Sequence, residues 1–130
     1  MDIEAELVQA FEALTGEESA TRVPKPAPAR FIHVRRKGGS TNGARGDAAS
    51  VFRDKPLIDV MVSAEDEDAA VALADQIEAF MLTAVQTQPF TVPCYEVDQF
   101  IRAWSDDDLD GVFIAPRVWL SYRMSLRKNM

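Results

Sequence analysis

The chain has one cysteine, one histidine and no long apolar run. Cys94 alone cannot form an intrachain disulfide, which fits a reducing compartment. His33 has no second histidine and no cysteine at metal-ligand spacing, so no metal site is expected on it. No apolar stretch approaches the roughly 18 residues that span a bilayer, and the N-terminus lacks the basic and apolar regions of a signal peptide. We therefore expect a protein made in a cytoplasm, without membrane association.

Basic residues are outnumbered, with 14 Lys and Arg against 21 Asp and Glu, which gives a net charge of −7. Such an acidic protein gains nothing from general attraction to nucleic acid. Its 130 residues with 47 % hydrophobic content suffice for one domain with a core of its own. We expect residues 1–130 to form this single domain.

The segment 56–85 organises the chain. Residues 57–62 are apolar and rich in β-branched side chains, which predicts a buried strand. Ser63 is expected to cap the following helix, with Asp66 as the reciprocal residue of a capping box. The first turn is filled by acids that the helix dipole favours: Glu65, Asp66, Glu67 and Asp68. Apolar residues at three- and four-residue steps continue to Ala84, which predicts a helix of about five turns.

The flanking segments show further regular patterns. Asp2 and Gly16 bracket a predicted helix, and residues 30–36 alternate as a strand. Residues 94–104 alternate weakly and 118–127 cleanly, which predicts two more strands. The order helix-strand-strand-helix-strand-strand predicts an α+β two-layer sandwich, a four-stranded, mainly antiparallel sheet with helices packed on it.

Residues 37–54 contain most of the glycines, at Gly38, Gly39, Gly43 and Gly46. We expect them to prevent any regular core element and to form a flexible arm that joins the two strands of a hairpin. Gly38 and Gly43 have the outer spacing of a phosphate-binding loop. However, Ala44 and Arg45 stand where that motif needs Lys and Ser or Thr, so no nucleotide site is assigned.

Basic residues gather at this arm, as Arg35, Arg36, Lys37 and Arg45. Two interpretations remain open: a solvated hairpin tip, or a contact with an acidic neighbour such as another copy of the chain. A nucleic-acid contact has no support from interleaved aromatic residues.

Asp106, Asp108, Asp110 and Gly111 reproduce the first half of a calcium-binding loop. The second half fails, because Arg117 occupies the position of the bidentate glutamate. A solvated hairpin turn explains the segment, and a small calcium-binding module remains the alternative. An enzyme would have to use His33 or Cys94, but the sequence offers no combination of nucleophile, base and orienting group. We assign no catalytic residue, metal or cofactor.

Three segments together resemble the tail terminator proteins of long-tailed bacteriophages, the lambda-type head–tail joining family. They are Val-Arg-Arg-Lys-Gly-Gly at 34–39, Asp-Lys-Pro-Leu-Ile-Asp-Val-Met-Val-Ser-Ala at 54–64, and the acidic-capped helix with Ala-Leu-Ala at 72–74. The basic, alternating strand at 117–127 also matches the family. The chain departs from the family in a longer glycine arm and in the acidic turn at Asp106.

The resemblance implies a non-catalytic structural virion protein, assembled in the bacterial cytoplasm, that forms a six-fold ring on the head-proximal end of the tail tube. The ring would stop tube growth and dock the head. Its partners would be other copies of itself, the tube protein and the head–tail connector proteins, and DNA would pass through its lumen without specific binding. Another neck or completion protein is the alternative. The residues expected at the subunit or tube interface are Arg35, Arg36, Lys37, Gly38, Gly39, Arg45, Glu65, Asp66, Glu67 and Asp68.

Overall fold

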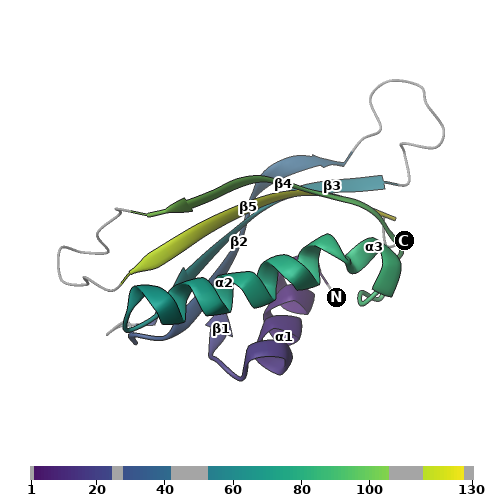
Figure 1. Cartoon of the computed structure of the whole chain (residues 1–130). Helices are drawn as coiled ribbons and strands as arrows, with labels where there is room; N and C mark the ends of the chain where they lie inside the picture. The colour runs from purple at the N-terminus through teal and green to yellow at the C-terminus, as the bar shows by residue number, and fades with distance from the viewer. Residues whose placement is uncertain (1, 25–27, 42–52, 106–115, 128–130) are drawn as a thin grey trace.

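The structure, a computed structural model, describes residues 2–24, 28–41, 53–105 and 116–127. Five strands form one sheet in the order β1-β2-β3-β5-β4, and the helices lie together on one of its faces (Figure 1). The elements in chain order are α1 (Ile3–Thr15), β1 (Ser19–Ala20), β2 (Phe31–Thr41), β3 (Arg53–Ser63), α2 (Glu67–Leu82), α3 (Ala84–Thr87), β4 (Cys94–Trp104) and β5 (Arg117–Arg127).

The predicted fold class was wrong, because the sheet is five-stranded and mixed and is accompanied by three helices. The additional strand β1 pairs in parallel with the start of β2, where Ser19 is opposite Ile32. A strand of two residues is too short to produce a detectable alternation. Parallel pairing becomes possible because α1 ends at Gly16 in the left-handed conformation, with φ at 74°. The chain then returns alongside β2.

The glycines at 38 and 39 do not interrupt the sheet, contrary to the expectation. Both lie within β2 and pair with Leu57 and Pro56 of β3. A β-bulge between Arg36 and Gly38 absorbs the irregularity, and glycine in a strand often marks such a bulge. The remainder of the expected arm, including Gly43, Arg45 and Gly46, lies outside the described residues.

The helix ends confirm one predicted cap and correct another. Asp2 caps α1, where its carboxylate accepts a hydrogen bond from the Ala5 amide at 2.9 Å. In α2 the cap is Asp66, which accepts from the Ala69 amide at 2.8 Å. Ser63 cannot cap the helix because it is the last residue of β3, opposite Arg117 of β5. The single long helix was also wrong, because α2 ends at Leu82 and the short α3 follows Thr83.

The core lies between the sheet and the helices. Its central layer consists of strand residues that alternate toward the helices, including Ile58, Val60, Val62, Leu120 and Tyr122. Aromatic rings join the helical side: Phe80 of α2 contacts Phe11 of α1 edge to face at 5.8 Å between ring centroids. Phe80 also contacts Phe90, which follows α3, at 6.1 Å. In the described part of the chain, no helix is long and apolar enough to cross a membrane.

A polar network ties α2 to the edge strand β4. The Glu78 carboxylate accepts hydrogen bonds from Arg102 at 2.8 Å and from the Gln99 amide at 2.9 Å. Arg102 also donates to Asp75 at 2.7 Å. The Arg102 guanidinium, with the Gln99 amide, holds the pKa of Glu78 below its usual range.

Glu78→Gln is expected to make stability less dependent on pH in acid. Because the folded-state pKa of Glu78 is lowered, its stabilisation is present above the unfolded-state pKa of about 4.3 and is lost as pH falls through the folded value. The variant should therefore lose about 1 kcal/mol at pH 7 and little near pH 3. Melting curves at both pH values measure the difference. Glu18→Gln, at an exposed residue without an ion pair among the described residues, is the control, and equal deficits at both pH values would contradict the expectation.

Candidate functional site

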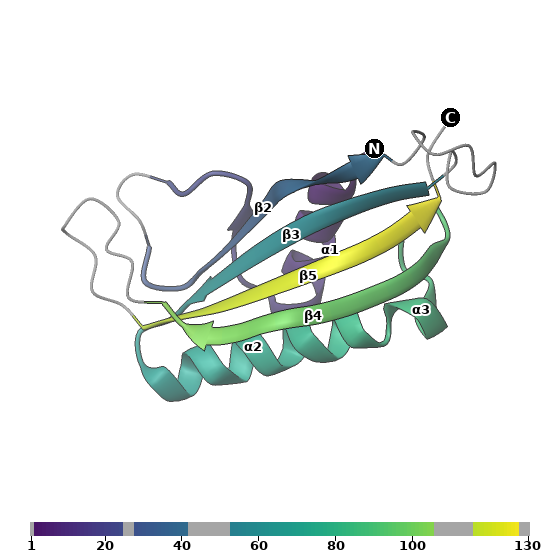
Figure 2. The ribbon, with the colours of Figure 1, turned by 90° about the horizontal axis from the view of Figure 1, so that it is seen from above.

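The face of the sheet opposite the helices is covered by no described element (Figure 2). Because strand side chains alternate between faces, the strand register fixes which residues lie on it. Three cross-strand rows can be followed: Arg35, Asp59, Ser121 and Ile101; His33, Met61, Trp119 and Ala103; and Leu57, Arg123 and Asp98. This uncovered face mixes apolar and charged side chains in neighbouring rows, a composition that a protein contact surface can have.

A polar cluster occupies the middle of the uncovered face. The Ser121 hydroxyl donates a hydrogen bond to Asp59 at 2.7 Å. The Lys37 ammonium lies 3.8 Å from the other oxygen of Asp59 and 5.4 Å from the ring centroid of Trp119. Lys37 is thus held over the sheet by a carboxylate and an aromatic ring.

Toward β4 the same face carries two neighbouring carboxylates. A hydrogen bond and charge repulsion between Asp98 and Glu96 raise the pKa of Glu96. The Arg123 guanidinium lies 5.9 Å from the ring centroid of Phe100, on the row of Asp98. A carboxylate pair of this kind is stabilised by any cation that approaches it.

The predicted basic cluster is largely neutralised within the chain. Arg36 makes a bidentate ion pair with Asp54, at 3.0 and 2.9 Å, and Lys37 is paired with Asp59. Arg35 is exposed and makes no ion pair with a described residue. The two glycines are strand residues of β2, and Arg45 lies outside the described residues. Arg35 is therefore the residue of this cluster whose charge is available to a neighbour.

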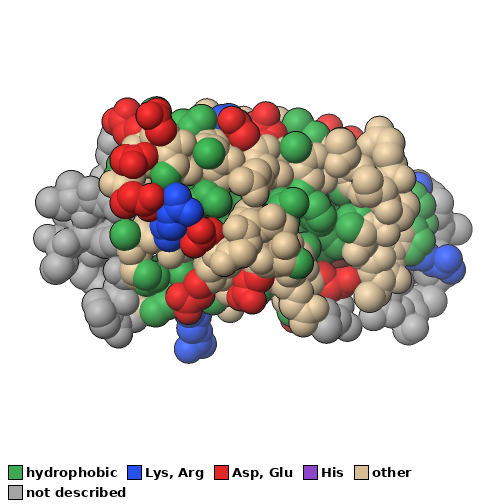
Figure 3. Space-filling model, turned by 60° about the horizontal axis from the view of Figure 1, so that its bottom comes forward, with side chains coloured by type: hydrophobic (Ala, Val, Ile, Leu, Met, Phe, Trp, Pro, Cys, Tyr) green, Lys and Arg blue, Asp and Glu red, His purple; other side chains and the backbone are tan. Residues whose placement is uncertain are grey.

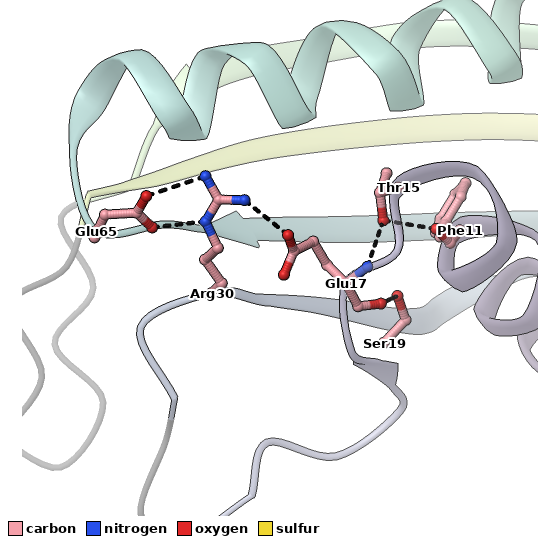
Figure 4. A network of polar contacts seen from close by, with 6 residues as sticks. All are labelled: Phe11, Thr15, Glu17, Ser19, Arg30 and Glu65. Atoms are coloured by element: carbon pink, nitrogen blue, oxygen red, sulfur yellow. Dashed lines mark hydrogen bonds and ion pairs between the residues drawn. The ribbon is translucent and has the colours of Figure 1, made fainter.

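The predicted acidic cluster lies elsewhere, at the start of α2. Figure 3, which views the helical side, shows acidic side chains gathered over one end of the molecule. Glu65 is engaged by Arg30 through two hydrogen bonds at 2.7 and 3.0 Å, and Arg30 also donates to Glu17 at 2.7 Å. Figure 4 shows this bridge between the end of α1 and the start of α2. The Arg30 guanidinium lowers the pKa of Glu65.

Of the other acids in this cluster, Asp66 is occupied as the helix cap. Glu67 and Asp68 are exposed in the first turn of α2. Opposite charges therefore do lie at different places on the subunit, but intrachain pairs use several of them. The fold does not bring the two predicted clusters together, and an interface between copies at these residues remains a prediction.

The two residues considered for an enzyme lie far apart. His33 is on β2 and Cys94 on β4, with β3 and β5 between them, which separates the strands by roughly 14 Å. His33 bonds to the Thr21 carbonyl at 3.1 Å, whereas Cys94 is buried and its pKa is raised by that burial. In the parts of the chain described, no three His, Cys, Asp or Glu side chains converge as metal ligands do. The turn at Asp106, for which calcium binding was the alternative to a solvated hairpin turn, lies outside these parts.

The sequence did not reveal the aromatic character of the β4 edge. Tyr95, Phe100 and Trp104 are 43, 52 and 48 % exposed. Two bulges, between Cys94 and Glu96 and between Gln99 and Ile101, shift the alternation along this strand. The only signal available beforehand was the weakness of the alternation at 94–104.

The first position of the β4 edge is blocked by a side chain. The Gln88 amide donates to the Cys94 carbonyl at 2.7 Å, and its oxygen accepts from the Cys94 amide at 2.8 Å. Gln88 also donates to the Val85 carbonyl at 2.7 Å. The backbone of Gln88 is left-handed, with φ at 48°. This strained conformation is compensated by the hydrogen bonds that the Gln88 side chain makes to the main chain of Cys94.

Comparison with known proteins adds no family assignment. The chain matches no protein-family model, and no curated protein matches it.

Proposed function

We propose that this chain is a ring-forming structural protein that caps the head-proximal end of a bacteriophage tail tube, stops tube growth and presents a docking surface to the head. The resemblance of residues 34–39, 54–64 and 72–74 to tail terminator proteins is the basis for proposing a ring on the tail tube. The observation that supports it is the uncovered sheet face, with its rows of apolar and charged residues from four strands.

The physical properties of the chain agree with such a role. A ring needs one surface of a subunit to meet a different surface of the next, and a sheet with all its helices on one face has dissimilar sides (Figure 1). A net charge of −7 suits a lumen through which DNA passes without adhering. The tube protein and the connector proteins would contact the two ends of the ring.

The test uses the purified full chain and tail tubes polymerised from the tube protein of the same genome. Light scattering should give the mass of a ring, six times 14.4 kDa for a hexamer. Electron microscopy should show density at one end of each tube, and added protein should stop further growth. Tubes that bind nothing and continue to elongate would overturn the proposal. Density in an assembled virion one layer above the tube would instead identify another neck or completion protein.

A further inference from the structure

Among the described residues, the two outermost long strands of the sheet have edges that no other strand fully covers. β4 forms one edge, and the described residues place no strand on its outer side. On the other edge, β1 pairs only with Ile32 and His33 of β2. The rest of β2, from Val34 onward, has no described strand outside it. Long unpaired edges are ready templates for another strand, so proteins cover or disrupt those that remain exposed.

Main-chain hydrogen bonds fix which groups point outward. The Ile32 amide donates outward to the Glu18 carbonyl at 3.0 Å, so by alternation Val34 and Arg36 also direct their main-chain groups away from β3. The Ser105 amide donates inward to the Arg117 carbonyl at 2.9 Å. The amides of Trp104 and, further along β4, of Val97 therefore point outward, away from β5, because their partners Val118 and Met124 are an even number of residues apart. Both edges consequently offer donors and acceptors to a strand beside them.

The directions of the strands allow these edges to meet in successive copies. β2 is antiparallel to β3, β3 to β5, and β5 to β4, so β2 and β4 run in opposite directions. A second copy placed alongside in the same orientation would bring its β2 antiparallel to β4 of the first. Such a contact joins two different edges and repeats around a ring.

Charges on the uncovered face favour the same contact, between the β4 edge of one copy and the β2 edge of the next. β4 carries the carboxylates of Glu96 and Asp98, and the hydrogen bond and repulsion between them raise the pKa of Glu96. β2 carries Arg35, which has no described ion-pair partner. The Arg35 row and the Asp98 row are two residues apart along β5, a spacing of about 7 Å that an arginine side chain can span.

We infer that copies of this chain join head to tail by main-chain pairing of the β4 edge of one copy with the β2 edge of the next, with Arg35 facing Asp98. Each of the two edges would thus bind another copy of this chain. This inference deepens the proposed function and rests on it, since it names the contact that closes the ring. The exposed Phe100 of β4 adds apolar area to that contact.

The charge pair is tested by exchange. Arg35→Glu and Asp98→Lys should each weaken self-association at least tenfold in sedimentation velocity at low salt, and the double variant should recover most of the loss. Glu67→Lys introduces a lysine in the acidic cluster that the sequence predicted at the interface, and because the inferred contact lies at the strand edges instead, it should leave association unchanged. Circular dichroism verifies that each variant is folded. Rescue of Arg35→Glu by Glu67→Lys instead of Asp98→Lys would overturn the inference and place the contact at the start of α2.

Main-chain pairing is tested at Val97, which is opposite Met124, because the free part of the β2 edge begins at Val34, on the row of Arg102. Val97→Pro removes an outward amide, which an edge strand tolerates, and it should weaken association at least tenfold beyond Val97→Ala, which only shortens the side chain. Equal association of the two variants would overturn the pairing, as would a wild-type chain that remains monomeric. Tube capping is measured separately, so a chain that caps tubes while these variants assemble normally refutes this interface and leaves the proposed function standing.

Discussion

Phe11→Ala should lower the free energy of unfolding by about 3–5 kcal/mol, the cost of removing a fully buried aromatic side chain. Phe11 has no exposed surface and makes the edge-to-face contact through which α1 is joined to Phe80 of α2. Its loss removes that contact, and because the ring pairs continue to Phe90, the cavity lies where three segments meet. Urea denaturation monitored by circular dichroism measures the change.

Phe11→Leu is the matched control, because leucine retains most of the buried apolar volume and should cost substantially less than alanine. A deficit below 1 kcal/mol for Phe11→Ala would show that the helices can close around the missing ring. In that case the aromatic contacts would not be what holds α1 on the sheet.

Gln88→Glu should destabilise the fold by about 2 kcal/mol at neutral pH. The amide nitrogen of Gln88 donates to two carbonyls, those of Val85 and Cys94. A carboxylate oxygen in its place would face both carbonyl oxygens without a proton to share. The substituted acid should therefore have a raised pKa in the folded state, and its destabilisation should shrink as pH falls toward 4. Thermal melts between pH 4 and pH 7 follow this recovery.

Two further variants separate the hydrogen bonds of Gln88 from its strained backbone. Gln88→Ala loses the bonds and keeps the left-handed φ of 48°, whereas Gln88→Gly loses the bonds and removes the strain. Glycine should be the more stable of the two by about 1 kcal/mol. A pH-independent deficit in Gln88→Glu would show that the amide geometry is not what stabilises the start of β4.

The parts of the fold that the sequence predicts are those governed by neighbours along the chain. The alternation of 118–127 is realised as β5, and the first helix begins and ends at Asp2 and Gly16 as expected. The pairing of β1 and the order of the strands depend on contacts between distant segments. Ser63 shows the same limit, since a strand partner, Arg117, determines that it stays in β3.

The candidate site was harder to predict for a related reason. Arg36, Lys37 and Glu65 were identified by charge, but their partners Asp54, Asp59 and Arg30 lie 18 or more residues away and only the fold brings each pair together. The aromatic edge of β4 was missed because two bulges displace its side chains from the simple alternation. Of the predicted basic cluster, Arg35 is the residue that has a described position and makes no ion pair with another described residue.

The hairpins β2–β3 and β4–β5 have their connected ends at opposite ends of the long axis of the sheet. Thr41 and Asp54 lie level with Leu126, whereas Trp104 and Val62 lie level with Val118. The described residues at those ends differ in charge: Arg53 lies opposite Arg127 at one end, whereas the acids Glu65, Asp66, Glu67 and Asp68 follow the end of β3 at the other. Subunits joined side by side would therefore build an annulus whose two rims carry unequal charge. The two faces of such a ring would differ in charge, and this difference would arise from the charge distribution of a single protomer.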